Sequence, residues 1–432
     1  MRTKRFLGVV LSAVMCLSLP ASFTAFAAED TCTSHSYING FCTVCDSYQS
    51  AVQNENGYYE IGNAGQLYWF ADKVNNDYDN YNRANAILTD NITVNKNVLV
   101  SGELNTNEEV VAAFRAWTPI GNDGSIYYNG TFEGNGKTVS GLYFNESNTS
   151  YVGLFGCTGS ATIQNVSVAD SYFHGNIYVG GVAGSGDGTI TNCRNAAYVS
   201  GYGYVGGING HCHDVTIENC YNTGTVKAEA IVGGVMGQHN GGTVKNCYNI
   251  GSVTGNIGLF GGVLGSLVSG TVTNCYYLDS SCTSVGDGGT AKTAEQFKSG
   301  EVAYLLQGQQ ETDVWGQIIG IDSYPVLGGM KVIFENDTYK NQVTEFEIIS
   351  LGENKKSANV AFLTKGTYTL ILADYEESRL NNIDTITVET ESDNTIKTVT
   401  SEKDITLGIG DKVMLWKDME NLVPMCEAYI VE

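Results

Sequence analysis

The pattern of hydrophobic and polar positions repeats between residues 151 and 275. An apolar, glycine-rich phrase begins five times, at Tyr151, Tyr178, Tyr204, Ile231 and Leu259. Each copy is followed by a Thr-Ile or Thr-Val phrase, which in the last four copies ends in Asn-Cys and places cysteines at 193, 220, 247 and 275. Val166 takes the cysteine position in the first copy, so the spacing is nearly constant. A fixed period of about 20 to 50 residues indicates stacked structural units.

Each repeat contains three short β-type runs, such as 178–183, 189–193 and 198–200, and has no room for a long helix. Glycine and asparagine separate the runs, and both accept the positive φ of a tight corner. Three strands and three corners form a triangular coil, and successive coils stack with like residues about 4.8 Å apart. Two apolar columns would fill the core: Ile190, Ile217, Val244 and Val272, and Val182, Ile208, Val235 and Val263. The sequence therefore predicts a mainly β protein built on a right-handed parallel β-helix.

The glycine cores of the five copies, 153–156, 181–184, 207–210, 234–237 and 262–265, carry a Gly-apolar-any-Gly pattern. They resemble the GLUG motif, as does the Asn-Cys-Tyr-Asn-Thr-Gly phrase at 219–224. This resemblance implies a secreted or surface-displayed module of a Gram-positive, Firmicute-like bacterium and implies no reaction.

Residues 1–27 are predicted to be a secretory signal peptide. They combine a basic start (Arg2, Lys4 and Arg5), an apolar stretch and an Ala-Phe-Ala cleavage site at 25–27. Cleavage would change the formal net charge from −23 to −26, which disfavours nucleic acid and anionic membranes as partners. No later segment is apolar over the length that a membrane-spanning helix needs, so we expect no membrane insertion after cleavage and a secreted, extracellular or cell-surface location.

Residues 28–57 contain a Cys/His-rich segment. Cys32, His35, Cys42 and Cys45 form a Cys-x2-His and a Cys-x2-Cys pair, which together offer three thiolates and one imidazole to a tetrahedral zinc ion. The alternative is disulfide bonding, which a secreted chain permits. Three cysteines cannot all pair among themselves, which favours one structural zinc. No motif predicts an organic cofactor.

The remaining segments complete a predicted domain order. Thr293-x-x-Gln296 has the form of a capping box at the start of a helix. Residues 334–432 contain short strand-like runs joined by turns, which is typical of an immunoglobulin- or fibronectin-like β-sandwich. After the signal peptide and the Cys/His-rich segment, the expected order is an N-terminal cap with a helix (58–85), the β-helix (86–282), a C-terminal cap with a helix (283–333) and the β-sandwich (334–432).

Two groups of side chains are candidates for binding. His211, His213 and His239 would meet on one edge of adjacent coils, as a metal or acid–base patch or as a solvated corner. Tyr221, Tyr248 and Tyr276 recur with the period of the repeat and would form an exposed column that stacks on sugar rings. Another column, Tyr151, Tyr178 and Tyr204, continues as Ile231 and Leu259 and is expected to face inward.

The search for catalytic motifs finds no His-Glu-x-x-His, Gly-x-Ser-x-Gly or phosphate-binding loop. The sequence favours a non-catalytic binding or adhesion protein whose partner is a glycan or an extracellular or host protein. The alternatives are a carbohydrate-active β-helix enzyme, either a polysaccharide lyase or a glycoside hydrolase, and a purely structural spacer. The oligomeric state is left open.

Overall fold

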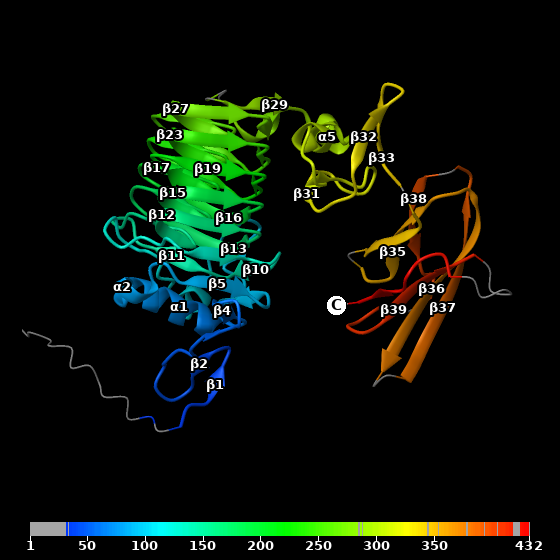
Figure 1. Ribbon diagram of the computed structural model, residues 1–432, viewed down its shortest axis with the longest axis horizontal. Helices are drawn as coiled ribbons and strands as arrows, with labels where there is room; N and C mark the ends of the chain where they lie inside the picture. Colours follow the sequence, from blue (N-terminus) through cyan, green and yellow to red (C-terminus); the bar gives the residue numbers. More distant parts are fainter. Residues whose placement is uncertain are drawn as a thin grey trace, which may run out of the picture.

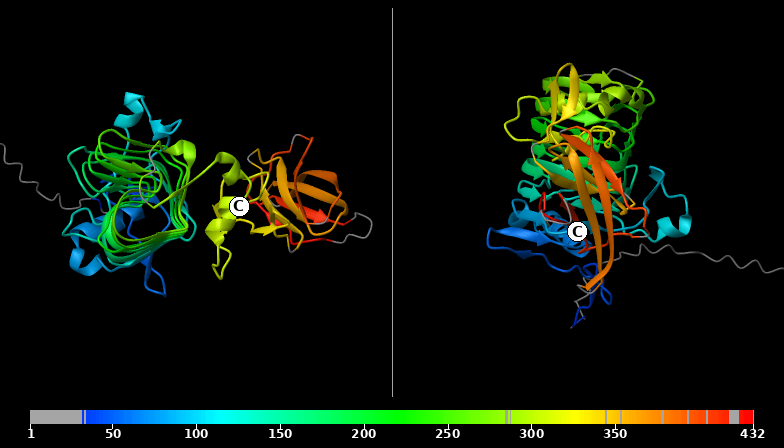
Figure 2. Two further views of the ribbon diagram at one scale, coloured as in Figure 1. Left: turned by 90° about the horizontal axis from the view of Figure 1, so that it is seen from above. Right: turned by 90° about the vertical axis from the view of Figure 1, so that its right-hand side faces the viewer.

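The computed structural model describes residue 32 and residues 34–431, with gaps at 284–285, 287, 344, 353, 377–378, 393, 404 and 418–423. The predicted signal peptide lies outside these residues. A parallel β-solenoid of about eight coils forms the first part of the described chain (Figure 1). Viewed along the solenoid axis, the coils superimpose in one outline (Figure 2).

Each coil passes through up to three sheets. The first sheet contains β3 (Val52–Gln53), β4 (Tyr58–Ile61), β5 (Asn85–Leu88), β9 (Thr131–Glu133), β12 (Phe155–Gln164), β15 (Ala183–Thr191), β18 (Asn209–His211), β19 (Val215–Glu218), β23 (Met236–Lys245) and β27 (Leu264–Thr273). The second contains β6 (Ile92–Thr93), β10 (Thr138–Ser140), β11 (Tyr143–Asn145), β13 (Ser167–His174), β16 (Arg194–Gly201), β20 (Tyr221–Asn222), β21 (Val226–Ala228), β24 (Tyr248–Asn249), β25 (Val253–Gly255), β28 (Tyr276–Leu278) and β29 (Thr290–Lys292). The third contains β14 (Val179–Gly180), β17 (Tyr204–Gly206), β22 (Ile231–Gly233) and β26 (Leu259–Gly261).

The register confirms the predicted stacking of like residues. Ile190 pairs with Ile217, Ile217 with Val244, and Val244 with Val272 in consecutive parallel strands. The column extends to Ile163 and Phe132 in the earlier coils. The period of the sequence is therefore the length of one coil.

Asparagine forms the corner between the first and second sheets. The corner residues all have positive φ, between 50° and 56°: Asn165, Asn192, Asn219, Asn246 and Asn274. Asparagine tolerates this left-handed conformation better than most residues. A second column of asparagines lies inside the core, where the Asn195 amide donates to Asn222 Oδ1 and the Asn222 amide donates to Asn249 Oδ1, each at 2.7 Å. These bonds satisfy polar groups that have no access to water.

The Asn-Cys cysteines, which are one coil apart, form a buried column of free thiols: Cys193, Cys220, Cys247 and Cys275. The backbone N–H of Cys193 donates to the sulfur of Cys220 in the next coil at 3.4 Å, and Cys220 repeats this contact to Cys247. Burial raises the pKa of the Cys220 and Cys275 thiols. All four side chains pack within the hydrophobic core of the solenoid.

Helix α1 (Ala64–Asn76) covers the first coil, at the opposite end of the solenoid from β27 (Figure 1). The Asn63 side chain caps it by accepting from the Gln66 N–H at 3.0 Å. Its apolar face, which includes Leu67, Phe70 and Val74, is fully buried. Two short helices, α2 (Tyr78–Tyr81) and α3 (Glu108–Ala112), and the hairpin of β7 (Leu99–Val100) and β8 (Glu103–Leu104) project from the early coils.

The segment after the last coil packs on the side of the solenoid (Figures 1 and 2). It contains η1 (Asp279–Ser281), α4 (Ala294–Lys298), α5 (Glu301–Gln307), β30 (Trp315–Gly316), β31 (Val326–Leu327), β32 (Val332–Glu335) and β33 (Thr338–Asn341). The predicted capping box of Thr293 and Gln296 opens α4. We call residues 293–333 the side cap, because Phe297, Leu306 and Trp315 cover the outer face of the second sheet. The sequence had predicted a C-terminal cap over 283–333, and the structure places this segment on the side of the solenoid.

The C-terminal part, from β34 onward, consists of antiparallel β-sheets. One sheet has the order β34 (Glu347–Leu351), β35 (Ser357–Phe362), β38 (Thr395–Thr400), and another has the order β37 (Arg379–Thr390), β36 (Gly366–Glu376), β39 (Lys412–Trp416), β40 (Tyr429–Ile430). Both sheets contribute to one hydrophobic core, which includes Phe362, Leu370 and Leu415. The finer assignment to an immunoglobulin- or fibronectin-like sandwich stays a prediction.

Candidate functional site

The Cys/His-rich segment folds as a hairpin. Strands β1 (Tyr37–Ile38) and β2 (Phe41–Cys42) are antiparallel and joined by Asn39 and Gly40, which have φ of 48° and 78°. Asn-Gly is the residue pair that a tight two-residue turn with positive φ favours. The backbone then bends back, so that the Cys42 N–H donates to the Ser47 carbonyl at 2.9 Å.

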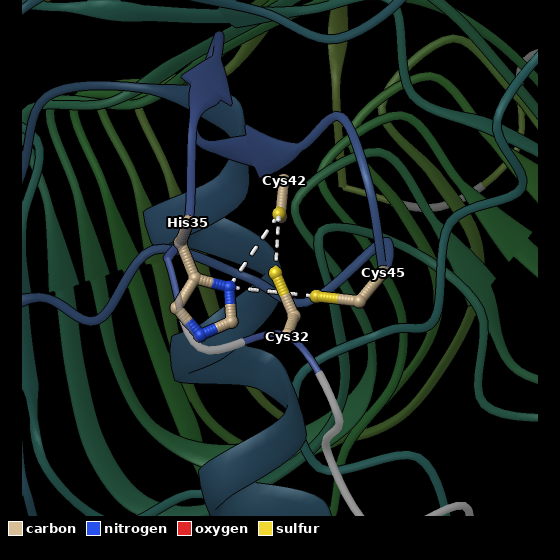
Figure 3. Close-up of side chains that lie close together, drawn as sticks. All are labelled: Cys32, His35, Cys42 and Cys45. Atoms are coloured by element: carbon tan, nitrogen blue, oxygen red, sulfur yellow. Dashed lines mark hydrogen bonds between the residues drawn. The ribbon is translucent and has the colours of Figure 1, made fainter.

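This hairpin brings all four predicted ligands together (Figure 3). The ligand atoms of Cys32, His35, Cys42 and Cys45 lie within 4.8 Å of one another. The His35 Nδ1 atom is 3.4 Å from the sulfurs of both Cys42 and Cys45, and the sulfurs of Cys32 and Cys42 are 4.0 Å apart. Tetrahedral zinc, with Zn–S bonds of about 2.3 Å and Zn–N bonds of about 2.05 Å, places sulfurs roughly 3.8 Å apart and sulfur and nitrogen roughly 3.6 Å apart. The donor set and its spacing therefore fit a zinc ion.

The electrostatic environment favours a thiolate at one of these positions. Backbone N–H groups of Val44 and Cys45, together with His35, lower the pKa of Cys42 to about 5. Desolvation and the neighbouring thiols raise the pKa of Cys32 to about 11. A metal ion binds thiolates, so binding at Cys32 would release a proton.

Contacts with the solenoid hold the hairpin in place. The Asn39 side chain accepts from the Ala64 N–H at the start of α1 and donates to the Thr93 carbonyl. The Arg115 guanidinium lies 4.0 Å from the centre of the Phe41 ring and forms a 3.2 Å ion pair with Asp46. These contacts hold the hairpin against the capped end of the solenoid.

The structure separates the three histidines of the second candidate site. His211 lies on the outer side of the first sheet against the rings of Tyr178, Tyr204 and His213, with ring centres 5.0, 5.4 and 5.0 Å away. His239 points into the core, where its Nδ1 lies 3.5 Å from the Cys212 sulfur. The prediction that these residues meet on one edge is therefore wrong for His239, because side chains alternate between the two faces of a strand.

Burial of His239 predicts a pH-dependent stability. Desolvation is the largest effect on this side chain and lowers its pKa below 6.5, against the weaker opposing effects of backbone carbonyls and Asp214. The unfolded chain therefore binds more protons than the folded chain as the pH falls below about 6.5, and stability falls with it. We expect the melting temperature to drop between pH 7.5 and pH 5, with a smaller drop in His239→Gln. Equal pH dependence of both proteins in calorimetry would contradict this role of His239.

The tyrosine column proposed as a sugar platform is buried. Tyr221, Tyr248 and Tyr276 are 9, 1 and 8 % exposed and pack against the side cap. The Tyr221 and Tyr248 rings stack at 4.9 Å, and the Tyr248 hydroxyl donates to the Pro325 carbonyl at 2.6 Å. The prediction of exposure is wrong, because residues far along the chain cover this face.

The column that was expected to face inward lies at an outer corner. Tyr151, Tyr178 and Tyr204 are half-buried, and Leu259 at the end of the column is 56 % exposed. The Tyr178 and Tyr204 rings stack nearly parallel at 5.6 Å. This inward prediction is also wrong.

A third tyrosine column, which the repeat analysis did not identify, borders an open groove. Tyr143, Tyr172 and Tyr198 stack on the outer face of the second sheet, with ring centres 6.1 and 5.2 Å apart. Tyr172 and Tyr198 line a cavity of about 360 Å³ together with His174, Tyr202, Lys227 and Glu229. We call these six residues the tyrosine groove.

Polar groups within the tyrosine groove are held by short contacts. His174 Nδ1 lies 2.9 Å from the Ser200 hydroxyl, and burial lowers the pKa of this histidine. The Glu229 carboxylate accepts from the Asn256 amide at 2.7 Å. Tyr202 is 57 % exposed and offers an aromatic ring to solvent. An accessible ring beside hydroxyl, imidazole, amine and carboxylate groups suits a polyhydroxylated ligand.

Comparison with known proteins finds two partial similarities. The chain is 38 % identical over 93 residues to Halomucin of Haloquadratum walsbyi, and this match covers 21 % of the chain and 1 % of Halomucin. It is 32 % identical over 80 residues to a putative Gly-rich membrane protein of Evansella cellulosilytica, covering 18 % of the chain and 9 % of that protein. The matches therefore span small parts of these relatives. No family model and no solved structure matches the chain.

A search of the described residues for a helix long and apolar enough to cross a membrane finds none.

Proposed function

We propose that this protein is secreted or displayed at the cell surface and binds a glycan in the tyrosine groove without transforming it. The observation that carries the proposal is an exposed tyrosine ring, Tyr202, in a cavity of about 360 Å³ whose other walls are tyrosines and polar side chains. Ring stacking with hydrogen bonds to hydroxyls is the usual chemistry of sugar recognition. The names of the partial relatives, Halomucin and a putative Gly-rich membrane protein, agree with a surface location.

The groups that line the groove favour binding over glycoside hydrolysis. Hydrolysis of a glycosidic bond generally uses two carboxyl groups on opposite sides of the bond. Glu229 is the one carboxylate that lines the groove in the described chain. The Cys/His cluster has a structural part in this proposal: one zinc ion with four protein ligands leaves no open coordination position for catalysis.

The test is binding of the purified full chain to a glycan and mucin array, followed by affinity measurement for the best ligand. Tyr202→Ser removes the accessible ring and should weaken binding roughly 2- to 10-fold, the contribution of one aromatic contact. Tyr127→Ser is the matched control, because Tyr127 is an exposed tyrosine outside the groove.

Equal affinities of Tyr202→Ser and the unmodified protein would contradict the groove assignment. Absence of any glycan ligand, with binding to an extracellular protein instead, would favour a protein partner. Depolymerisation of a polysaccharide that is lost in His174→Ala would replace the binding proposal with the enzyme alternative.

A further inference from the structure

A second cavity lies where the side cap meets the outer face of the second sheet. Its volume is about 430 Å³, within the range of roughly 300–1,000 Å³ that is usual for small-molecule sites. Arg194, Asn192 and Tyr221 line it from the solenoid, and Asp313 and Leu327 line it from the side cap. Arg194 begins the same strand, β16, that carries Tyr198 of the tyrosine groove about 13 Å further along.

Arg194 lies next to the buried tyrosine column, at the edge of the surface that the side cap covers. In register, Ser167 lies in the coil below it and Tyr221 in the coil above it, where the side cap begins to cover the tyrosines. The guanidinium lies 5.7 Å from the centre of the Tyr221 ring, so one face of the group is held against an aromatic surface. No acidic side chain forms an ion pair with Arg194 in the described part of the chain. Asp313, the acid that lines the cavity, pairs with Lys331 at 2.8 Å.

In the described chain, two of the residues that line this cavity each have a buried polar atom without a hydrogen-bond partner. These atoms are the Arg194 Nε–H, which needs an acceptor, and Asn192 Oδ1, which needs a donor. Leaving such a group unpaired destabilises the folded state, and more so when the group is charged.

The orientation of the Asn192 amide follows from its neighbours. The Asn165 amide donates to the Glu133 carboxylate at 3.0 and 3.2 Å, which leaves Asn165 Oδ1 as an acceptor. The Asn192 amide donates to that oxygen at 3.0 Å, so its own oxygen points to the next coil. The next corner residue is Asn219, whose Oδ1 accepts from the Trp315 indole of the side cap at 3.1 Å. The chain of hydrogen bonds along the corner asparagines therefore stops between Asn192 and Asn219, next to the cavity.

We propose that this cavity binds a sugar acid, with its carboxylate on Arg194 and a hydroxyl group on Asn192. The ligand must supply an anionic acceptor and a neutral donor close together, which is the chemistry of a carboxylate beside hydroxyl groups. A guanidinium binds a carboxylate through charge-assisted and often paired hydrogen bonds. The ligand is either a free uronic acid or the terminal uronic acid of an acidic polysaccharide, since the two share this chemistry.

Titration calorimetry of the full chain with glucuronate tests the proposal, with glucose and acetate as comparisons. Glucose lacks the charge and should bind at least about 10-fold more weakly than glucuronate, the factor expected from one lost charge-assisted hydrogen bond. Acetate keeps the charge but lacks the hydroxyl groups, and should bind roughly 2- to 10-fold more weakly, the factor expected from one lost neutral hydrogen bond. Equal binding of acetate would overturn the assignment to a sugar acid. A second titration compares a chain of four uronic acids with the monomer. Tighter binding of the chain indicates the end of a polysaccharide as the natural ligand, and equal binding indicates a free acid.

Variants separate this cavity from the tyrosine groove. Arg194→Gln removes the charge and should reduce glucuronate affinity by about 10-fold or more, and Arg194→Lys should also weaken it because an ammonium lacks the planar paired donors. Tyr202→Ser should leave glucuronate binding unchanged, while Arg194→Gln should leave binding in the groove unchanged. If circular dichroism shows that Arg194→Gln does not fold, the unmodified protein is tested for competition between glucuronate and the groove ligand. Competition between the two ligands would overturn the proposal of a separate site. Absence of glucuronate binding to the unmodified protein also overturns it.

Discussion

Tyr248→Ser is expected to destabilise the protein strongly and to release the side cap. Tyr248 is 1 % exposed and contacts Tyr221, Phe297 and Trp315. Replacing a buried aromatic side chain with a small one typically costs about 3–5 kcal/mol, because packing is lost and a cavity remains. The change also removes the hydroxyl that donates to Pro325. Calorimetry should show a lower melting temperature, and limited proteolysis should cut within the side cap.

Tyr204→Ser is the matched control for this experiment. Tyr204 stacks in an analogous column on Tyr178, but it is only half-buried and contacts no residue of the side cap among its described ring contacts. We expect a smaller loss of stability and no new proteolytic cleavage of the side cap. Equal effects of the two substitutions would contradict the conclusion that the side cap covers the Tyr248 column.

Metal content is expected to change from one zinc to none when two cysteines of the hairpin are replaced. The purified protein should contain about one equivalent of zinc, the number that a four-ligand site binds. Cys42→Ser with Cys45→Ser leaves one thiolate and one imidazole, which is too few for a structural site. Because β1 and β2 are very short strands, the hairpin should become sensitive to protease when metal is lost.

Cys426→Ser provides the control for the metal experiment, since Cys426 is a free, partly buried cysteine in the C-terminal part of the chain. Its zinc content should equal that of the unmodified protein. A disulfide between Cys42 and Cys45, mapped in metal-free native protein, would refute the zinc assignment and support the disulfide alternative.

The tyrosine groove shows why a periodic pattern can hide a site. The repeat analysis followed positions at one constant spacing, but the step from Tyr143 to Tyr172 is longer than the step from Tyr172 to Tyr198. Tyr143 pairs with Tyr172 at the same offset as the residues before it, and a change of register after Ala169 brings Tyr172 opposite Tyr198. The one residue that β13 has in excess of β16 forms an irregularity, where Asp170 has a φ of 41° and the Ser171 hydroxyl donates to the Ala169 carbonyl. Irregularities of this kind redirect side chains without ending a strand.

The sequence by itself determined the properties that depend on local repetition. Its period set the coil length, and the Asn-Cys phrase set both the left-handed corner and the buried thiol column, because each coil repeats the environment of the previous one. The spacing of Cys32, His35, Cys42 and Cys45 was enough to predict a four-ligand cluster, since the four residues lie within one short segment.

Only the tertiary structure decided which outer surfaces are free. Tyr221 and Tyr248 recur once per coil, and this spacing is the same whether a column is exposed or covered. They are buried because Phe297 and Trp315, from the segment after the last coil, pack on them. The cavity at Arg194 exists because the side cap ends beside this residue, and no periodicity encodes that position. Contacts between a repeat and a non-repeating segment depend on how the whole chain packs, and for this reason the fold was readable from the pattern while the candidate binding sites were not.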